Sequence, residues 1–177
     1  MDPRLQEMLD HHEIRKTLAQ YCNACDRCNE PRMADIYLED SWDDHGTVKA
    51  PGWEYSTIMT AAILETTESI SHLLGQSSIS VDGDVAGAET YFLAVSRTNE
   101  DGQRMINQLG GRFIDVLHRD GDRWQIKNRK VVRDWTLAVP IEKDWEAAQE
   151  LTPGERSDAD PSYAVLGLVH GQVGARL

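Results

Sequence analysis

The second half of the sequence is divided into four long segments by turns that share an Asp-Gly pair. The segments span residues 70–81, 85–97, 103–118 and 123–139. An Asp-Gly pair is typical of the tight turn of a β-hairpin, because glycine adopts positive φ at little steric cost. Consecutive strands joined by tight turns pair antiparallel. The sequence therefore predicts one strongly curved antiparallel sheet in this half of the chain.

The first half shows helical patterns instead. Apolar residues at spacings of three and four predict an amphipathic helix over residues 4–28, and Pro31 favours a first helical turn. The remaining predicted elements are helices over residues 32–38, 55–67 and 140–150 and a strand over residues 41–49. Helices that precede a run of strands indicate an α+β fold with helices on one face of a bent sheet. Such a cone-shaped arrangement closes an apolar pocket suited to a small molecule.

The length of 177 residues is typical of one domain with a hydrophobic core. We expect this domain to span residues 1–140. Residues 141–177 form a short helix and a tail rich in Pro, Gly and acidic residues, ending in an apolar patch. We expect this tail to pack on the pocket mouth or on a neighbouring subunit.

The composition disfavours several classes of function. A net charge of −12 disfavours binding to nucleic acid phosphates, and the absence of a long apolar run predicts no membrane span. The first residues lack the apolar stretch of a signal peptide, which predicts a cytoplasmic protein. The sequence has no phosphate-binding loop, dinucleotide fingerprint or nucleophile elbow, so we expect chemistry without a cofactor.

Three cysteines, Cys22, Cys25 and Cys28, have spacings that could suggest a metal site. Structural zinc sites use four ligands, usually as pairs from separate loops, and this chain has no second cysteine pair. Because the spacing is helical, we expect reduced thiols, with Cys22 and Cys25 on the buried helix face, and no metal.

The best candidates for chemistry are Tyr21 and Asp26 near the end of the first helix and His72 at the start of the β half. A carboxylate that orients an imidazole makes a general base, and a nearby phenol can stabilise an oxygen. Each residue also has an ordinary interpretation: His72 as a core histidine, Asp26 as a solvated helix end and Tyr21 as a core tyrosine.

Further candidates lie on the predicted strands and beside the third helix. Arg133 shares a strand phase with Val131 and Trp135 and could hold a substrate oxygen or pair with an acid. Asp115 shares a face with Asn107 and Phe113, and we expect it to pair with an arginine. The remaining predicted substrate contacts are Trp53, Tyr55, Asn107 and Phe113. The spacing of His11, His12, His45 and His118 gives no functional signal.

Several of these pieces occur in an order that is similar to a known family. They are His12-Glu13-Ile14-Arg15, Tyr21 with Asp26, His72-Leu73-Leu74-Gly75, Val81-Asp82-Gly83-Asp84, Gly110-Gly111-Arg112-Phe113-Ile114-Asp115, Asp120-Gly121, Trp124 and Arg133-Asp134-Trp135. Over residues 8–137 the chain resembles the SnoaL-like branch of the nuclear transport factor 2-like superfamily, which has a cone-shaped α+β fold. The superfamily includes cofactor-free dehydratases, a dehydrochlorinase, isomerases, cyclases, enzymes that release formaldehyde from aromatic compounds, and non-catalytic binding domains.

The resemblance implies roles for Tyr21, Asp26, His72 and Arg133, which match the Tyr/Asp pair, histidine and strand arginine of a dehydratase in this family. The segment 91–95 lacks an acidic residue that this dehydratase carries. The leading hypothesis is a cofactor-independent lyase that acts on a small, mostly apolar, oxygenated aromatic substrate, with loss of water or formaldehyde. An isomerase or cyclase with the same base, and a non-catalytic binding module, are the alternatives. The resemblance also implies a homo-oligomer, either a dimer or a trimer.

Overall fold

A computed structural model describes residues 2–168 of the chain. Helix α1 (Pro3–Asp26) begins with proline in its first turn, and the Asp2 side chain accepts a hydrogen bond from the backbone N–H of Arg4. Its buried side chains include Ile14, Leu18 and Tyr21, at the predicted spacing. The predicted helix is thus confirmed, and it ends two residues earlier than expected.

The segment after α1 differs from the prediction in its boundaries. Helix α2 (Glu30–Ala34) is shorter than expected, because Asn29 caps it and the chain enters strand β1 (Tyr37–Asp44) soon afterwards. A turn with Gly46 at φ +79° separates β1 from strand β2 (Lys49–Ala50), so the predicted strand over residues 41–49 is divided. Helix α3 (Gly52–Thr66) begins directly after Pro51, earlier than predicted.

The predicted meander of four strands is confirmed. It comprises β3 (Thr67–Asp82), β4 (Val85–Glu100), β5 (Gln103–Asp120) and β6 (Arg123–Pro140). Each strand pairs antiparallel with the next. Gly83, Gly102 and Gly121 all have positive φ, which explains why every turn contains a glycine.

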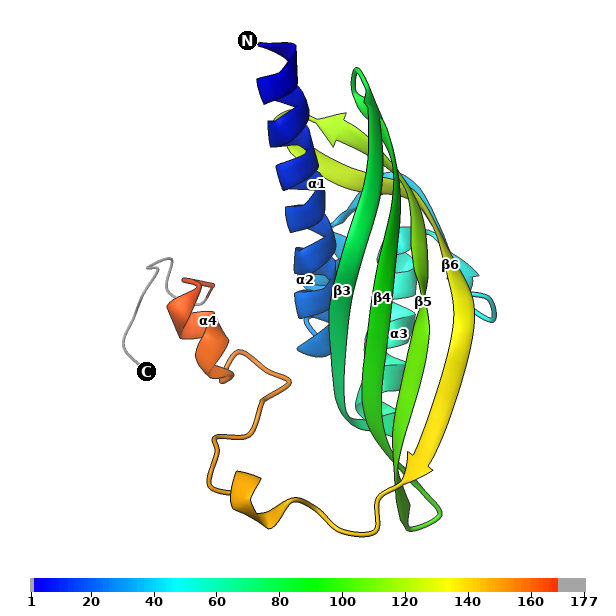
Figure 1. The fold of residues 1–177 in the computed structure, drawn as a ribbon, viewed down its shortest axis with the longest axis vertical. Coiled ribbons are helices and arrows are strands. Elements are labelled where there is room, and N and C mark those ends of the chain that lie inside the picture. Colours follow the sequence, from blue (N-terminus) through cyan, green and yellow to red (C-terminus); the bar gives the residue numbers. More distant parts are fainter. Residues whose placement is uncertain (1, 169–177) are drawn as a thin grey trace.

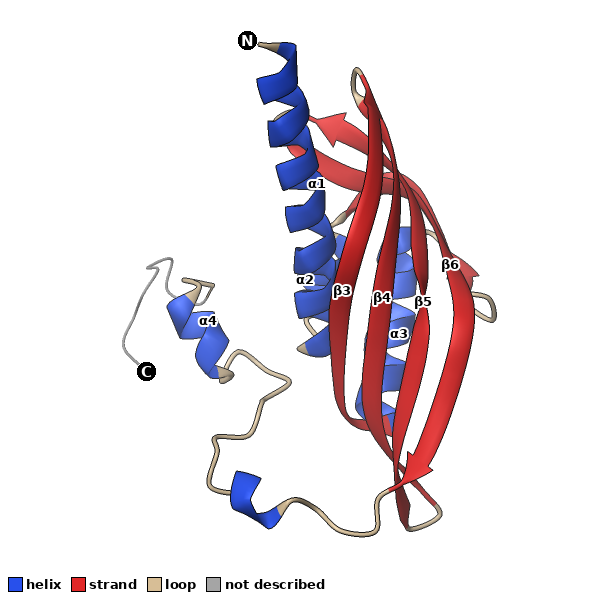
Figure 2. Cartoon of the chain, in the orientation of Figure 1, coloured by secondary structure: helices blue, strands red, loops and turns tan. Residues whose placement is uncertain are grey.

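The complete sheet has the strand order β2-β1-β6-β5-β4-β3. Strand β1 runs parallel to β6, so the sheet is mixed and the expectation of a wholly antiparallel sheet is corrected. The parallel partner of β1 lies far along the chain, because α3 and the meander separate β1 from β6. Figure 2 shows the curved strands and the helices on one side of them.

The helices cover the concave side of the sheet. Helix α1 lies along β3, and α3 lies behind β4 and β5 (Figure 1). The buried residues between these layers form one core, which includes Ile14, Leu18, Phe92 and Phe113. No helix among residues 2–168 is long and apolar enough to cross a membrane.

The tail contains less helix than expected. Residues 140–150 form only a 3₁₀ turn (Glu146–Ala148), and a short helix α4 (Pro161–Val165) follows. Tyr163 is buried, and its hydroxyl accepts a hydrogen bond from the side-chain amide of Asn29 at 2.7 Å. The Arg156 guanidinium donates to the backbone oxygens of Ile63 and Thr67. The described tail therefore packs against the helices of its own chain, and packing on a neighbouring subunit stays a prediction.

Candidate active site

A cavity of about 580 Å³ lies between the concave face of the sheet and helices α1 and α3. Among the predicted site residues, those that line this cavity are Tyr21, Tyr55, His72, Asn107, Phe113 and Arg133. Most of the other lining side chains are apolar, including Met59, Ile63, Phe92 and Leu109. An apolar cavity with a few polar groups is typical of a small-molecule site.

His72 and Asp26 form a hydrogen-bonded pair at one side of the cavity. The Asp26 carboxylate accepts from the backbone N–H of His72 at 2.9 Å and bonds its ring nitrogen Nδ1 at 2.6 Å. Asp26 is the last residue of α1, and His72 lies near the start of β3, so packing of this helix against this strand brings them together. A carboxylate at Nδ1 places the ring hydrogen there and leaves Nε2 able to accept a proton.

Tyr21 and Tyr55 bring two phenol groups together in the same cavity. Their hydroxyl oxygens are 3.4 Å apart, and burial raises the pKa of each phenol well above its usual value. Both groups are therefore neutral near pH 7. They can donate hydrogen bonds to a substrate oxygen, which agrees with the role predicted for Tyr21.

Arg133 reaches the cavity from β6. Its guanidinium has no ion-pair partner within residues 2–168. The pairing register of β5 and β6 shifts between Gly110 and Gly111, which places an extra residue in β6 after Arg133. Trp135 therefore does not share a strand face with Arg133 and Val131, and its side chain is 48% exposed. The prediction that these three residues lie on one face is thus corrected.

The predicted pairing of Asp115 with an arginine is confirmed. Arg129 donates from Nε and Nη2 to the two carboxylate oxygens of Asp115, at 2.7 and 2.8 Å, and both side chains are fully buried. The guanidinium carbon of Arg129 lies 4.2 Å from the ring centre of Tyr21 and 4.1 Å from that of Phe113. The ion pair therefore holds two rings of the cavity wall in place, with added cation–π attraction.

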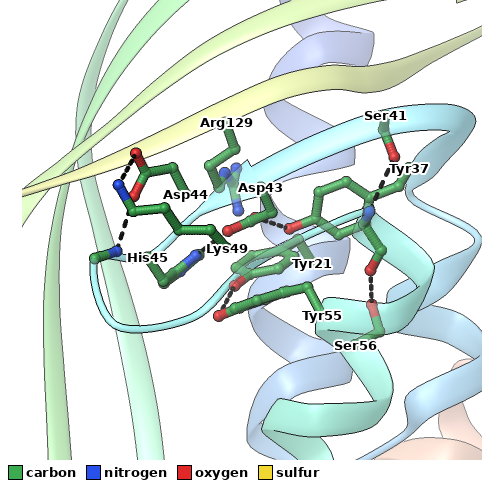
Figure 3. A network of polar contacts seen from close by, with 12 residues as sticks. Tyr21, Tyr37, Ser41, Asp43, Asp44, His45, Lys49, Tyr55, Ser56 and Arg129 are labelled. Atoms are coloured by element: carbon green, nitrogen blue, oxygen red, sulfur yellow. Dashed lines mark hydrogen bonds and ion pairs between the residues drawn. The ribbon is translucent and has the colours of Figure 1, made fainter.

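A second histidine–aspartate pair borders the cavity and was not predicted. Nδ1 of His45 is hydrogen-bonded to the Asp43 carboxylate, which also accepts from the Tyr37 hydroxyl at 2.6 Å (Figure 3). The His45 ring stacks on Tyr55 with ring centres 4.3 Å apart. Burial lowers the pKa of His45, although the neighbouring Asp43 opposes this shift. Asp43 and His45 are two residues apart, and side chains at this spacing share a face of an extended segment. This spacing was the signal in the sequence from which the pair could have been predicted.

The SnoaL-like domain family matches residues 6–130, which is more than two thirds of the chain. The chain belongs to this family. No curated protein matches the sequence. The resemblance seen in the sequence is thus confirmed, and so is the α+β fold that it implied.

Several solved structures share this SnoaL-like fold. A protein of Novosphingobium aromaticivorans, provisionally named a scytalone dehydratase, is 19% identical with a TM-score of 0.66, covering 78% of this chain and 97% of that chain. The hexachlorocyclohexane dehydrochlorinase LinA-type3 of Novosphingobium barchaimii is 14% identical with a TM-score of 0.68, covering 85% and 99%. A provisionally named β subunit of an aromatic-ring-hydroxylating dioxygenase from N. aromaticivorans is 19% identical, with a TM-score of 0.60 and coverage of 73% and 92%. The fold therefore occurs in proteins with different activities, and identities this low show the fold alone.

The structure corrects the predicted position of Trp53 and confirms the predicted burial of two cysteines. Trp53 lies on α3 rather than in a loop, is 53% exposed and does not line the cavity. Cys22 and Cys25 are buried free thiols as expected, and burial raises the pKa of Cys22 to about 12. Within residues 2–168, no group of His, Cys, Asp and Glu side chains is arranged to hold a metal ion.

Proposed function

We propose that this SnoaL-like protein is a cofactor-independent lyase in which His72 is the general base. The observation that supports the proposal is the pair of hydrogen bonds that the Asp26 carboxylate accepts from the backbone N–H and the ring Nδ1 of His72. This contact holds the ring in one orientation beside a cavity that contains apolar and aromatic side chains. An imidazole held in this orientation can accept a proton from a bound substrate at Nε2.

In a dehydration, Nε2 of His72 accepts a proton from a substrate carbon. The electron pair of the broken C–H bond forms a C=C bond, and the neighbouring C–O bond breaks. The departing hydroxide takes a proton from the His72 imidazolium and leaves as water, so the base is regenerated. In a formaldehyde-releasing reaction, His72 instead removes the hydroxyl proton of a hydroxymethyl group. The C–C bond that holds this group breaks as its C–O bond becomes the C=O bond of formaldehyde. The carbanion that remains takes the proton back from the His72 imidazolium.

Two other cavity residues suit the oxygen atoms of such a substrate. Arg133 supplies a positive charge that no acidic side chain among residues 2–168 neutralises by an ion pair. The Tyr21 hydroxyl is a neutral donor, because burial raises the pKa of this phenol. Donors that already point at the site stabilise negative charge as it develops on a leaving group or a carbonyl oxygen.

The substrate class follows from the cavity wall. Phe92 and Phe113 stack with ring centres 4.3 Å apart, and both line the cavity together with Leu109 and Val131. A flat aromatic compound with a few oxygen atoms complements this surface. One structural neighbour is provisionally named a dehydratase and another is named a dehydrochlorinase, and both names describe eliminations, which supports the same type of reaction here.

We also propose that the protein acts as a homo-oligomer, a dimer or a trimer. Support comes from the outer face of the sheet, which we define by Leu73, Tyr91, Ile114, Val116 and Trp135. All five side chains are substantially exposed. Apolar groups gathered on one face are typical of an interface between proteins.

The test is mass spectrometry of a panel of hydroxylated aromatic and alicyclic compounds, including diarylpropanes, incubated with the metal-free protein. We expect at least one compound to lose one water or one formaldehyde. His72→Ala should lower this turnover by at least about a hundredfold, because a general base contributes that much or more. The matched control is His12→Ala, since His12 is exposed on α1 and distant from the cavity lining.

Near-normal turnover in His72→Ala would contradict the proposed mechanism. A rearranged product with unchanged mass would favour the isomerase or cyclase. Binding of compounds without any conversion would favour the non-catalytic binding module.

A further inference from the structure

Two histidines border the same cavity, and each is held by an aspartate at its Nδ1 atom. His72 is bound by Asp26, and His45 is bound by Asp43. In both residues Nε2 is therefore the ring nitrogen that remains for a ligand. Within residues 2–168, Nε2 of His45 has no hydrogen-bond partner, and His45 lines the cavity.

Aromatic rings occupy the cavity wall between the two histidines. Phe92 is 6.3 Å from His72 and 4.3 Å from Phe113, and Phe113 is 5.7 Å from Tyr21, all measured between ring centres. The Tyr21 hydroxyl meets that of Tyr55, whose ring stacks on His45. A substrate ring that packs on this wall has His72 at one side and His45 with the two tyrosines at the other.

The protonation state of His45 follows from the surroundings of Asp43. The Asp43 side chain is fully buried, and its oxygens receive the Tyr37 hydroxyl and Nδ1 of His45. A buried carboxylate needs donors, so Nδ1 of His45 carries the hydrogen. Because burial lowers the pKa of His45, the ring is neutral at pH 7 and its Nε2 atom can only accept a hydrogen bond.

The tyrosines add a donor beside this acceptor. When two hydroxyl groups bond to each other, one hydrogen is used between them and the other remains available. The Tyr21–Tyr55 pair therefore has one O–H left to donate. An acceptor and a donor together match a hydroxyl group, which needs both, whereas an ether or a carbonyl oxygen can use only the donor.

We propose that His45, held by Asp43, is a substrate-binding residue that accepts a hydrogen bond from a hydroxyl group on an aromatic ring. The pocket is thereby selective for phenols over the corresponding methyl ethers. This inference rests on the proposed function only in taking the same cavity as the substrate site, and it assigns His45 no part in proton removal.

The test compares the binding of para-phenylphenol and para-methoxybiphenyl by isothermal titration calorimetry. The wild-type protein should bind the phenol about tenfold more tightly, the effect of one good hydrogen bond in a buried site. In His45→Phe the two dissociation constants should become equal within about twofold, because a phenyl ring keeps the stacking on Tyr55 and removes the acceptor. His12→Phe is the matched control and should retain the full preference.

The proposal would be overturned if the wild type bound the two compounds equally or showed no saturable binding of the phenol. It would also be overturned if His45→Phe kept the preference for the phenol. If thermal unfolding shows that His45→Phe does not fold, a long-range ¹H–¹⁵N correlation spectrum of the wild type decides instead. The Nε2 resonance of His45 should move on addition of the phenol and stay in place with the ether. An unchanged resonance overturns the proposal.

The two proposals can fail separately. His72→Ala should keep the preference for the phenol, because His72 acts on turnover and not on the hydroxyl. Loss of turnover in His72→Ala without any phenol preference would retain the lyase and reject the role of His45. A phenol preference in a protein without turnover would retain His45 and reject the lyase.

Discussion

Three buried tyrosines, Tyr21, Tyr37 and Tyr55, surround the polar end of the cavity. Their rings meet edge to face, with centres 6.1 Å apart for Tyr21 and Tyr37 and 6.4 Å apart for Tyr37 and Tyr55. Burial raises the pKa of all three phenols well above the usual value. In the folded protein these groups keep their protons at a pH where the unfolded chain loses them.

This difference predicts a steep loss of stability in alkali. Above about pH 10 the unfolded state binds fewer protons than the folded state, so the free energy of unfolding falls as pH rises. With three such groups the slope approaches about 4 kcal/mol per pH unit. Tyr37→Phe should remove about a third of this slope, as measured by urea unfolding over a series of alkaline buffers. Tyr91→Phe is the control, because Tyr91 lies on the outer face of the sheet, and an equal slope in both variants would contradict the prediction.

At the residue level, the sequence predicted the neighbours of His72 better than those of His45. The helical pattern placed Asp26 at the end of α1, and the order of elements brought that end to β3. His45 follows β1 and precedes the turn at Gly46, so its direction depends on how β1 pairs with β6. That parallel pairing connects distant parts of the chain, and local spacing does not determine it.

At the level of elements, the irregularity in β5 and β6 decides what faces the cavity. The pairing register of the two strands shifts between Gly110 and Gly111. A methyl group on Gly111 would overlap the backbone oxygen of Val132, and one on Gly110 would overlap the Trp135 ring. Glycine is therefore required at Gly111, where the obstacle is backbone, whereas at Gly110 the Trp135 side chain would have to move.

Gly111→Ala should lower the free energy of unfolding by about 1–3 kcal/mol or more, because the backbone oxygen of Val132 cannot move aside as a side chain can. The shift of β6 should also displace Arg133 and weaken ligand binding. Urea unfolding and binding of para-phenylphenol measure the two effects.

Gly87→Ala is the matched control for this change. Gly87 lies within β4, and a methyl group there would meet no atom within 4 Å. If both variants had the same stability and affinity, the close contact at Gly111 would not control the register.

Element boundaries show where sequence patterns reach their limit. Asp-Gly turns are local signals, and all four strands of the meander were predicted from them. The start of α3 was predicted late, because Gly52 and Trp53 resemble loop residues in isolation. Gly52 is the first residue of α3 and lies against the Tyr37 ring, which leaves no room for a larger side chain.

At the scale of the whole molecule, the helices leave the convex side of the sheet uncovered (Figure 1). On this outer face Leu73, Tyr91 and Trp135 are about half exposed, at 56, 42 and 48%. Arg112 lies among them and is paired with Glu89 and Asp134, so its charge is neutralised within the chain. The outer face is thus largely apolar and suits a second copy of the same chain.

The proposed oligomer predicts that a charge on this face separates the subunits. Wild-type protein should sediment as a dimer or trimer, whereas Leu73→Lys should sediment as a monomer with an unchanged circular dichroism spectrum. A charged group buried in an interface without a partner costs several kcal/mol, which is enough to dissociate an oligomer at micromolar concentration. Leu151→Lys is the control, since Leu151 is 71% exposed in the tail and lies outside the sheet. A wild-type monomer, or an oligomer that persists in both Leu73→Lys and Trp135→Lys, would show that the outer face is not the interface.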